Sequence, residues 1–141
     1  MTVDKARLRR ARLIERVRSA EQRQAAGEAF RAEAVRRKLE QLSERTRSLA
    51  QVYALRDKAT DGADLRSAAI LSGHLRVLGD TAARQAGQAR READSKLFDL
   101  AAAERRRLRA EEARRDLHRS ILEQLAKPET VPMRKSGTHL E

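Results

Sequence analysis

The sequence that decides the fold is Ala59-Thr60-Asp61-Gly62-Ala63-Asp64, the one clear interruption of helix-forming sequence before the prolines near the C-terminus. Asp-Gly is a strong turn signal, because glycine tolerates the positive φ that ends a helix. Asp61 and Asp64 can cap the free N–H groups of a helix that follows. We therefore predict that a long helix stops here and that the chain runs back beside it, which brings both termini to the opposite end.

The composition favours an elongated helical protein. The 141 residues are 40% hydrophobic and 38% charged, but only 2% aromatic, so large side chains that fill a globular core are scarce. We predict an all-α rod built as a two-helix antiparallel coiled-coil hairpin. There is no cysteine, which excludes disulfides, thiolate metal sites and cysteine nucleophiles.

The first predicted arm covers residues 3–58 and contains no proline and a single glycine, Gly27. One helix of this length spans about 80 Å. Its apolar residues recur in steps of three and four, with a slip of one residue after Phe30 and Ala34 that we interpret as a stutter. The predicted seam comprises Leu13, Val17, Ala20, Gln24 and Gly27 before the slip, and Val35, Leu39, Leu42, Thr46, Leu49 and Tyr53 after it.

The second predicted arm covers residues 64–126, after a turn at 59–63. Lys127-Pro128 ends it, because the residue before a proline is driven out of helical conformation. Its predicted seam comprises Ala68, Leu71, Leu75, Leu78, Ala82, Ala86, Ala89, Ala93, Leu97 and Leu100. The hairpin domain is thus 1–126, and 127–141 is expected to be a disordered tail, whose last two residues, Leu140-Glu141, could be a cloning remnant.

Folding the sequence about Gly62 places residues opposite each other when their numbers sum to about 124. Phe30 then faces Ala93, and Leu97 and Phe98 face Ala26 and Gly27, a large-against-small match that favours a close-packed seam. A parallel homodimer of unbroken helices is the main rival, and it leaves the Asp-Gly break unexplained.

No catalytic or metal-binding constellation is present in the sequence. His74, His118 and His139 are far apart, and neither a phosphate loop nor a zinc motif occurs. We expect a non-enzymatic protein without a cofactor or a metal.

The start of the second arm carries two neighbouring apolar rows. One contains Leu71, Leu75 and Leu78, and the other contains Ile70, His74 and Val77. A single row suffices to close a seam, so one row can serve a partner, although a broad seam could take both. The clustering of Gly73, Gly79 and Gly87 softens this part of the rod.

The formal net charge of +11 suggests acidic partners. Nucleic acid is the weaker candidate, because aromatic side chains do not interleave with the basic ones. The arginines could also simply solvate a long helix surface. No stretch approaches the length of a transmembrane helix, and residues 7–18 lack the apolar core of a secretory signal, so we expect a cytoplasmic location.

The chain resembles the FliJ/YscO family, the stalk proteins of flagellar and virulence type III export. The resemblance lies in the basic N-terminal arm (KARLRRARLIERVR, 5–18), the central turn (TDG, 60–62), the apolar patch early in the returning helix (ILSGHLRVL, 70–78) and a charged C-terminal half. It implies a coiled coil whose terminal end enters a hexameric export ATPase, while the patch near the turn contacts the membrane export gate at the inner membrane. Export chaperones are further partners of the family.

The resemblance implies two sets of partner-binding residues, and it does not distinguish flagellar motility from virulence export. The gate would be met by Ile70, Leu71, His74, Leu75, Val77 and Leu78. The ATPase would be met by Arg9, Arg10, Arg12, Arg16, Arg114 and Arg115.

Two alternatives stay open. The first is a basic coiled-coil scaffold for nucleic acid or an anionic membrane surface, whose binding falls steeply with added salt, whereas docking through an apolar patch persists. The second is a homodimeric coiled-coil spacer.

Overall fold

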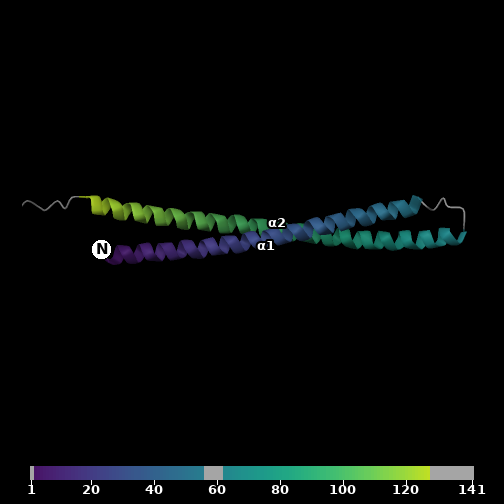
Figure 1. The fold of residues 1–141 in the computed structure, drawn as a ribbon, viewed down its shortest axis with the longest axis horizontal. Coiled ribbons are helices and arrows are strands. Elements are labelled where there is room, and N and C mark those ends of the chain that lie inside the picture. Colours follow the sequence, from purple (N-terminus) through teal and green to yellow (C-terminus); the bar gives the residue numbers. More distant parts are fainter. Residues whose placement is uncertain (1, 56–61, 128–141) are drawn as a thin grey trace, which may run out of the picture.

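The chain forms two long helices in a computed structural model that describes residues 2–55 and 62–127. Helix α1 spans Thr2–Leu55 and helix α2 spans Gly62–Ala126. They run antiparallel, with the start of α1 and the end of α2 together at one end of the rod (Figure 1). At 1.5 Å per residue the helices are about 80 Å and 100 Å long. The predicted all-α two-helix hairpin is confirmed.

The helix ends agree with the sequence in part. The described part of α1 stops at Leu55, and residues 56–61, with most of the predicted turn, lie outside the described residues. Gly62 was predicted to lie in the turn, but it is the first residue of α2, and no described glycine has the positive φ that an Asp-Gly turn allows. Glycine here opens a helix, and an N-terminal helical position has ordinary dihedrals. Asp64 lies in the first turn, where the helix dipole favours a carboxylate.

The C-terminal end of α2 falls at Ala126, as the proline rule predicts. The backbone N–H of Lys127 donates to the carbonyl oxygen of Glu123 at 3.0 Å, which closes the last turn. The rest of the predicted tail, 128–141, lies outside the described residues.

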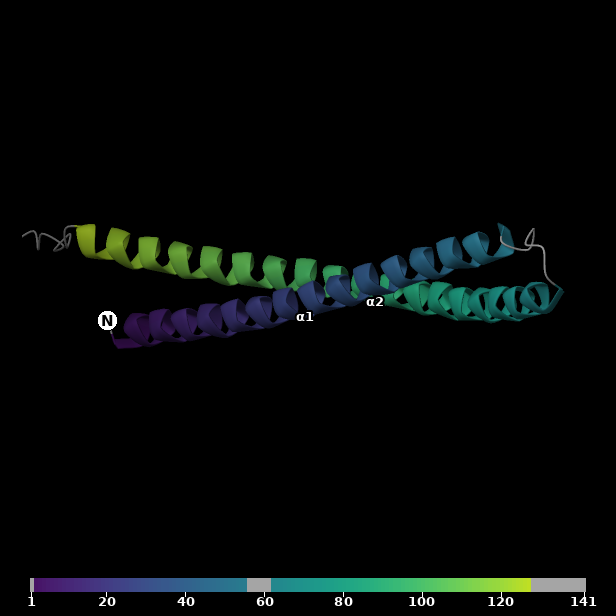
Figure 2. The same ribbon diagram turned by 45° about the vertical axis from the view of Figure 1, so that its right-hand side comes forward.

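The seam between the helices follows an unbroken heptad pattern in both. Half-buried or buried residues recur in alternating steps of three and four, the spacing that keeps one stripe of a helix against its partner. In α1 they are Leu8, Ala11, Glu15, Arg18, Gln22, Ala25, Ala29, Ala32, Arg36, Leu39, Ser43, Thr46, Ala50 and Tyr53. In α2 they are Leu65, Ala68, Ser72, Leu75, Gly79, Ala82, Ala86, Ala89, Ala93, Lys96, Leu100, Ala103, Arg107, Ala110, Arg114, Leu117 and Ile121. The two helices cross near mid-rod in both views, as strands of a supercoil do (Figures 1 and 2).

The predicted seam of α1 is therefore largely wrong. Leu39, Thr46 and Tyr53 do lie in the seam, but the other large apolar residues assigned to it point outward. The seam also runs from Leu8 to Tyr53 without a slip, so the predicted stutter is absent. The misassigned residues that are exposed are Leu13, Val17, Ala20, Gln24, Phe30, Val35, Leu42 and Leu49.

The predicted seam of α2 is closer to the structure. Ala82, Ala86, Ala89 and Ala93 are buried, and Leu75 is half-buried. Three assigned leucines are instead exposed: Leu71, Leu78 and Leu97.

The register between the helices agrees with the sequence, but the size matching does not. Lys96 Nζ lies 3.3 Å from Glu28 Oε2, a pair whose numbers sum to 124. However, Phe30 is 78% exposed and Phe98 is 70% exposed, whereas Ala93 is 1% exposed. Small residues line both sides of the seam around Ala93, and both phenyl rings project into solvent instead.

Charged side chains complete the seam toward the open end. Arg114 Nε lies 2.5 Å from Glu15 Oε2, and this ion pair joins α2 to α1. The same buried Nε has no hydrogen bond, so the contact is a charge attraction without hydrogen-bond geometry. Among the described residues, no large side chain is fully buried. The rod is held by a long, thin seam, and most of its large apolar side chains face outward.

Candidate partner-binding surfaces

The heptad pattern divides the rod into two faces. With Leu8 and Leu65 as a positions, the g positions of both helices flank the seam on one side and the e positions flank it on the other, as in any antiparallel pair. We call the side formed by positions c, f and g the g face, and the side formed by b and e the e face.

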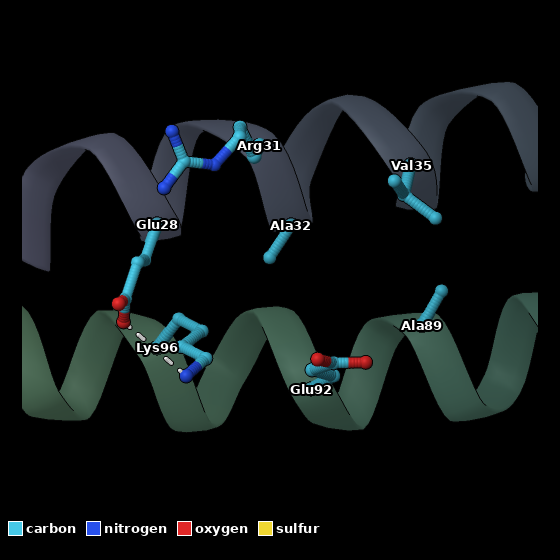
Figure 3. Close-up of a pocket in the computed structure, with 7 residues that line it drawn as sticks. All are labelled: Glu28, Arg31, Ala32, Val35, Ala89, Glu92 and Lys96. Carbon is cyan, nitrogen blue, oxygen red and sulfur yellow. Dashed lines mark hydrogen bonds and ion pairs between the residues drawn. The ribbon is translucent and has the colours of Figure 1, made fainter.

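A surface hollow at mid-rod demonstrates this geometry (Figure 3). Its walls include Glu28 and Val35 from g positions of α1 and Glu92 from a g position of α2. Val35 and Ala89 approach each other across the seam in this view. Flanking residues of the two helices therefore face a common depression.

The residues predicted to meet the gate lie mostly on the g face. Ile70 and Val77 are 62% and 64% exposed, and Leu71 and Leu78 are exposed as well. His74 is exposed, whereas Leu75 is half-buried in the seam. Both apolar rows thus contribute to the surface, and Ser72 and Gly79 occupy the seam positions beside Leu75.

The sequence reasoning missed the contribution of α1 to this face. Val35, Leu42 and Leu49 occupy successive g positions, and each is about half exposed. We call these three residues, together with Leu71 and Leu78, the apolar strip. The available signal was their own spacing of seven residues, which was attributed to the seam instead.

Carboxylates are confined to one face alongside the apolar strip, whereas arginines occur on both faces. Over residues 31–52 and 65–91 every carboxylate lies on the e face: Glu33, Glu40, Glu44 and Asp80. The g face over the same ranges carries His74 and five cationic side chains: Arg31, Lys38, Arg45, Arg84 and Arg91. The apolar strip therefore runs through a surface of positive charge.

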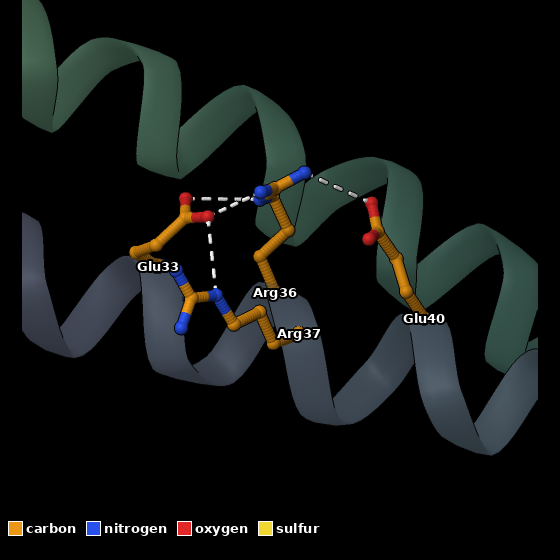
Figure 4. Close-up of polar contacts among 4 residues, drawn as sticks. All are labelled: Glu33, Arg36, Arg37 and Glu40. Atoms are coloured by element: carbon orange, nitrogen blue, oxygen red, sulfur yellow. Dashed lines mark hydrogen bonds and ion pairs between the residues drawn. The ribbon is translucent and has the colours of Figure 1, made fainter.

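The e face carries a compact ion-pair cluster on α1 (Figure 4). Arg36 donates hydrogen bonds to Glu33 and, at 3.2 Å, to Glu40. Arg37 adds a second cation, with its Nε 3.6 Å from Glu33. The hydrogen bond from Arg36 is the main cause that holds the pKa of Glu33 below its ordinary value, and the same bond raises the pKa of Arg36.

The open end gathers the predicted ATPase-binding arginines of α1. Arg9, Arg12 and Arg16 line one hollow together with Lys5 and two leucines, Leu8 and Leu13. These arginines recur at helical spacing, so their guanidinium groups share one side of the helix. Arg10 is exposed but does not line this hollow.

The predicted ATPase-binding arginines of α2 are engaged within the rod. Arg114 is half-buried in the seam and pairs with Glu15. Arg115 is exposed, with its Nη2 2.6 Å from Glu111 Oε1. Arg114 thus has a structural task that the α1 arginines do not share.

The described residues contain no group of three potential ligands positioned to hold a metal ion. Neither α1 nor α2 has a segment apolar enough to cross a bilayer. Comparison of the chain with family models, curated proteins and solved structures gives no match.

Proposed function

We propose that this protein is a non-enzymatic stalk of a type III protein export apparatus, which couples a hexameric export ATPase to the membrane export gate. It would act in the cytoplasm, at the periphery of the inner membrane. Handling of export chaperones would be a further task of the same rod.

The observation that carries the proposal is that one rod presents two separate candidate contact surfaces, one toward each end. The open end presents the exposed arginines Arg9, Arg12 and Arg16. The half near the turn presents large apolar side chains, among them Ile70 and Val77. A rod with a separate contact surface toward each end suits a protein that links two others.

The basic end supplies the direct experiment. The triple variant Arg9→Glu, Arg12→Glu and Arg16→Glu should reduce stimulation of the export ATPase, because carboxylates in a ring pore would then meet like charge. Arg114 is left unchanged, since its reversal would break the ion pair with Glu15 and weaken the hairpin itself. ATP hydrolysis is measured at low and moderate salt, and circular dichroism verifies helicity.

A matched control reverses three exposed arginines of the e face in the other half of the rod, Arg47, Arg66 and Arg76. It changes the net charge equally and should retain stimulation. If both triple variants stimulate the ATPase normally, or both fail equally, the open end is not a specific ATPase contact and the stalk proposal loses its support.

A further inference from the structure

We propose that the apolar strip and its basic borders bind an acidic amphipathic helix of a partner protein, which packs along both helices as a third strand. The inference rests on the proposed function only for which protein carries that helix, namely the export gate. The surface itself is argued from the rod.

The strip has the geometry of a helix-binding groove. The hollow at mid-rod shows that g positions of α1 and α2 border one depression. In steps of seven toward the turn, the flanking positions continue as Leu42 and Leu49 on α1 and as Gln85, Leu78 and Leu71 on α2. Ridges of branched apolar side chains on both sides of a seam suit a helix laid between them.

The floor of this groove is formed by d positions of both helices, as at the mid-rod hollow, where Ala32 and Ala89 line it. Toward the turn the d positions are buried or half-buried: Leu39 and Thr46 on α1, and Ala82 and Leu75 on α2. The two half-buried leucines add apolar surface beneath the flanking residues of the strip.

The charged side chains around the strip determine which kind of helix can bind there. Lys38 and Arg45 occupy c positions beside the strip on α1, and His74 occupies one beside it on α2. Asp64 near the turn and Glu28 and Glu92 at mid-rod occupy g positions at the two ends of the strip, but the g face between these ends carries no carboxylate. A helix with glutamates or aspartates beside its apolar stripe complements this part of the surface. A second copy of the chain, laid face to face, would instead place these cations against one another.

The probes are two synthetic helical peptides with the same leucine stripe, flanked by glutamates in one and by lysines in the other. Fluorescence anisotropy with the full chain should give binding of the glutamate peptide that is at least about tenfold tighter than that of the lysine peptide. Charge reversal by Lys38→Glu and Arg45→Glu should narrow or invert this preference.

The apolar contribution is tested with a matched pair of double variants. Leu42→Gln with Leu49→Gln should weaken the glutamate peptide by about tenfold or more. The control, Leu108→Gln with Leu122→Gln, changes leucines of similar exposure on the e face near the open end and should bind normally. Circular dichroism should show that the wild type and both double leucine variants are equally helical, since every altered leucine is about half exposed.

Three outcomes overturn the inference. Equal binding of both peptides removes the charge selection. If the protein dimerises with increasing concentration and Leu42→Gln with Leu49→Gln abolishes the dimer, the strip binds a second copy of the chain. If the protein binds phosphatidylglycerol vesicles and does not bind the peptide, the strip binds a membrane. If the glutamate peptide binds as expected but the cytoplasmic domain of the export gate does not, the surface stands and the proposed function fails.

Discussion

A larger side chain at the most buried alanine of the seam should destabilise this hairpin, although it adds apolar surface. Ala93 is 1% exposed, and the register places Ala29 and Ala32 of α1 opposite it. Ala93→Leu adds three carbon atoms, whose burial in a fitted space would stabilise the fold by about 2 kcal/mol. No such space exists between close helices, so overpacking should dominate, with a net loss of about 1 to 3 kcal/mol.

Urea unfolding followed by circular dichroism measures this loss. A decrease of about 2 kcal/mol lowers the midpoint by about 1 M when the slope is about 2 kcal/mol/M. The control is Ala113→Leu, at an exposed position of the same helix, which should change stability by less than about 0.5 kcal/mol. An Ala93→Leu variant as stable as the wild type, or more stable, refutes the small-residue seam.

Three further perturbations test other parts of the rod. Gly73→Ala should stabilise the protein by about 1 kcal/mol in thermal or urea unfolding, because no atom lies within 4 Å of the added Cβ and the φ is helical; a loss of stability would mean that the site is not open. Arg114→Ala should cost about 1 to 2 kcal/mol by leaving Glu15 without its partner in the seam, whereas replacing both by Leu should recover most of that loss; equal losses in the two variants would show that the ion pair is unimportant. The lowered pKa of Glu33 means that its stabilising contribution is present above its ordinary pKa and is lost as the pH falls through the lowered value. Unfolding of Glu33→Gln should therefore depend less on acid pH than that of the wild type, and identical pH profiles would contradict the pairing with Arg36.

The sequence predicts the fold class and the register because these depend on features with few alternatives. One break in a long helix-forming chain requires two arms, and the length of each arm sets which residues meet. The pairing of Glu28 with Lys96 agrees with the register expected from folding about Gly62. Proline at 128 likewise marks the end of α2.

The identity of the seam could not be derived in the same way. Two stripes of equal period lie side by side, one of large apolar residues and one rich in alanine, serine and glycine. Hydrophobicity selects the large stripe, but close approach of two helices favours the small one. The distinguishing signal was continuity, because the large-residue stripe of α1 required a slip after Phe30, whereas the seam series from Leu8 to Tyr53 did not.

The wrong assignment of the seam also affected the prediction of the partner-binding surface. Leu42 and Leu49 were assigned to the seam, so the sequence predicted a docking patch on one helix alone. The fold turns both leucines outward beside Leu71 and Leu78, which gives the patch a second wall. No pattern within a single helix can predict which residues of its antiparallel neighbour will share its face.

The central claim, that the buried members of the seam are small residues while most large apolar residues face outward, is tested most directly by cysteine labelling. The natural chain has no cysteine, so single variants report one position each. In the dilute folded protein, Leu78→Cys and Phe98→Cys should react with a maleimide almost as fast as the unfolded chain, whereas Ala82→Cys and Ala93→Cys should be strongly protected. Protection at positions 78 and 98, with rapid labelling at 82 and 93, would contradict the account.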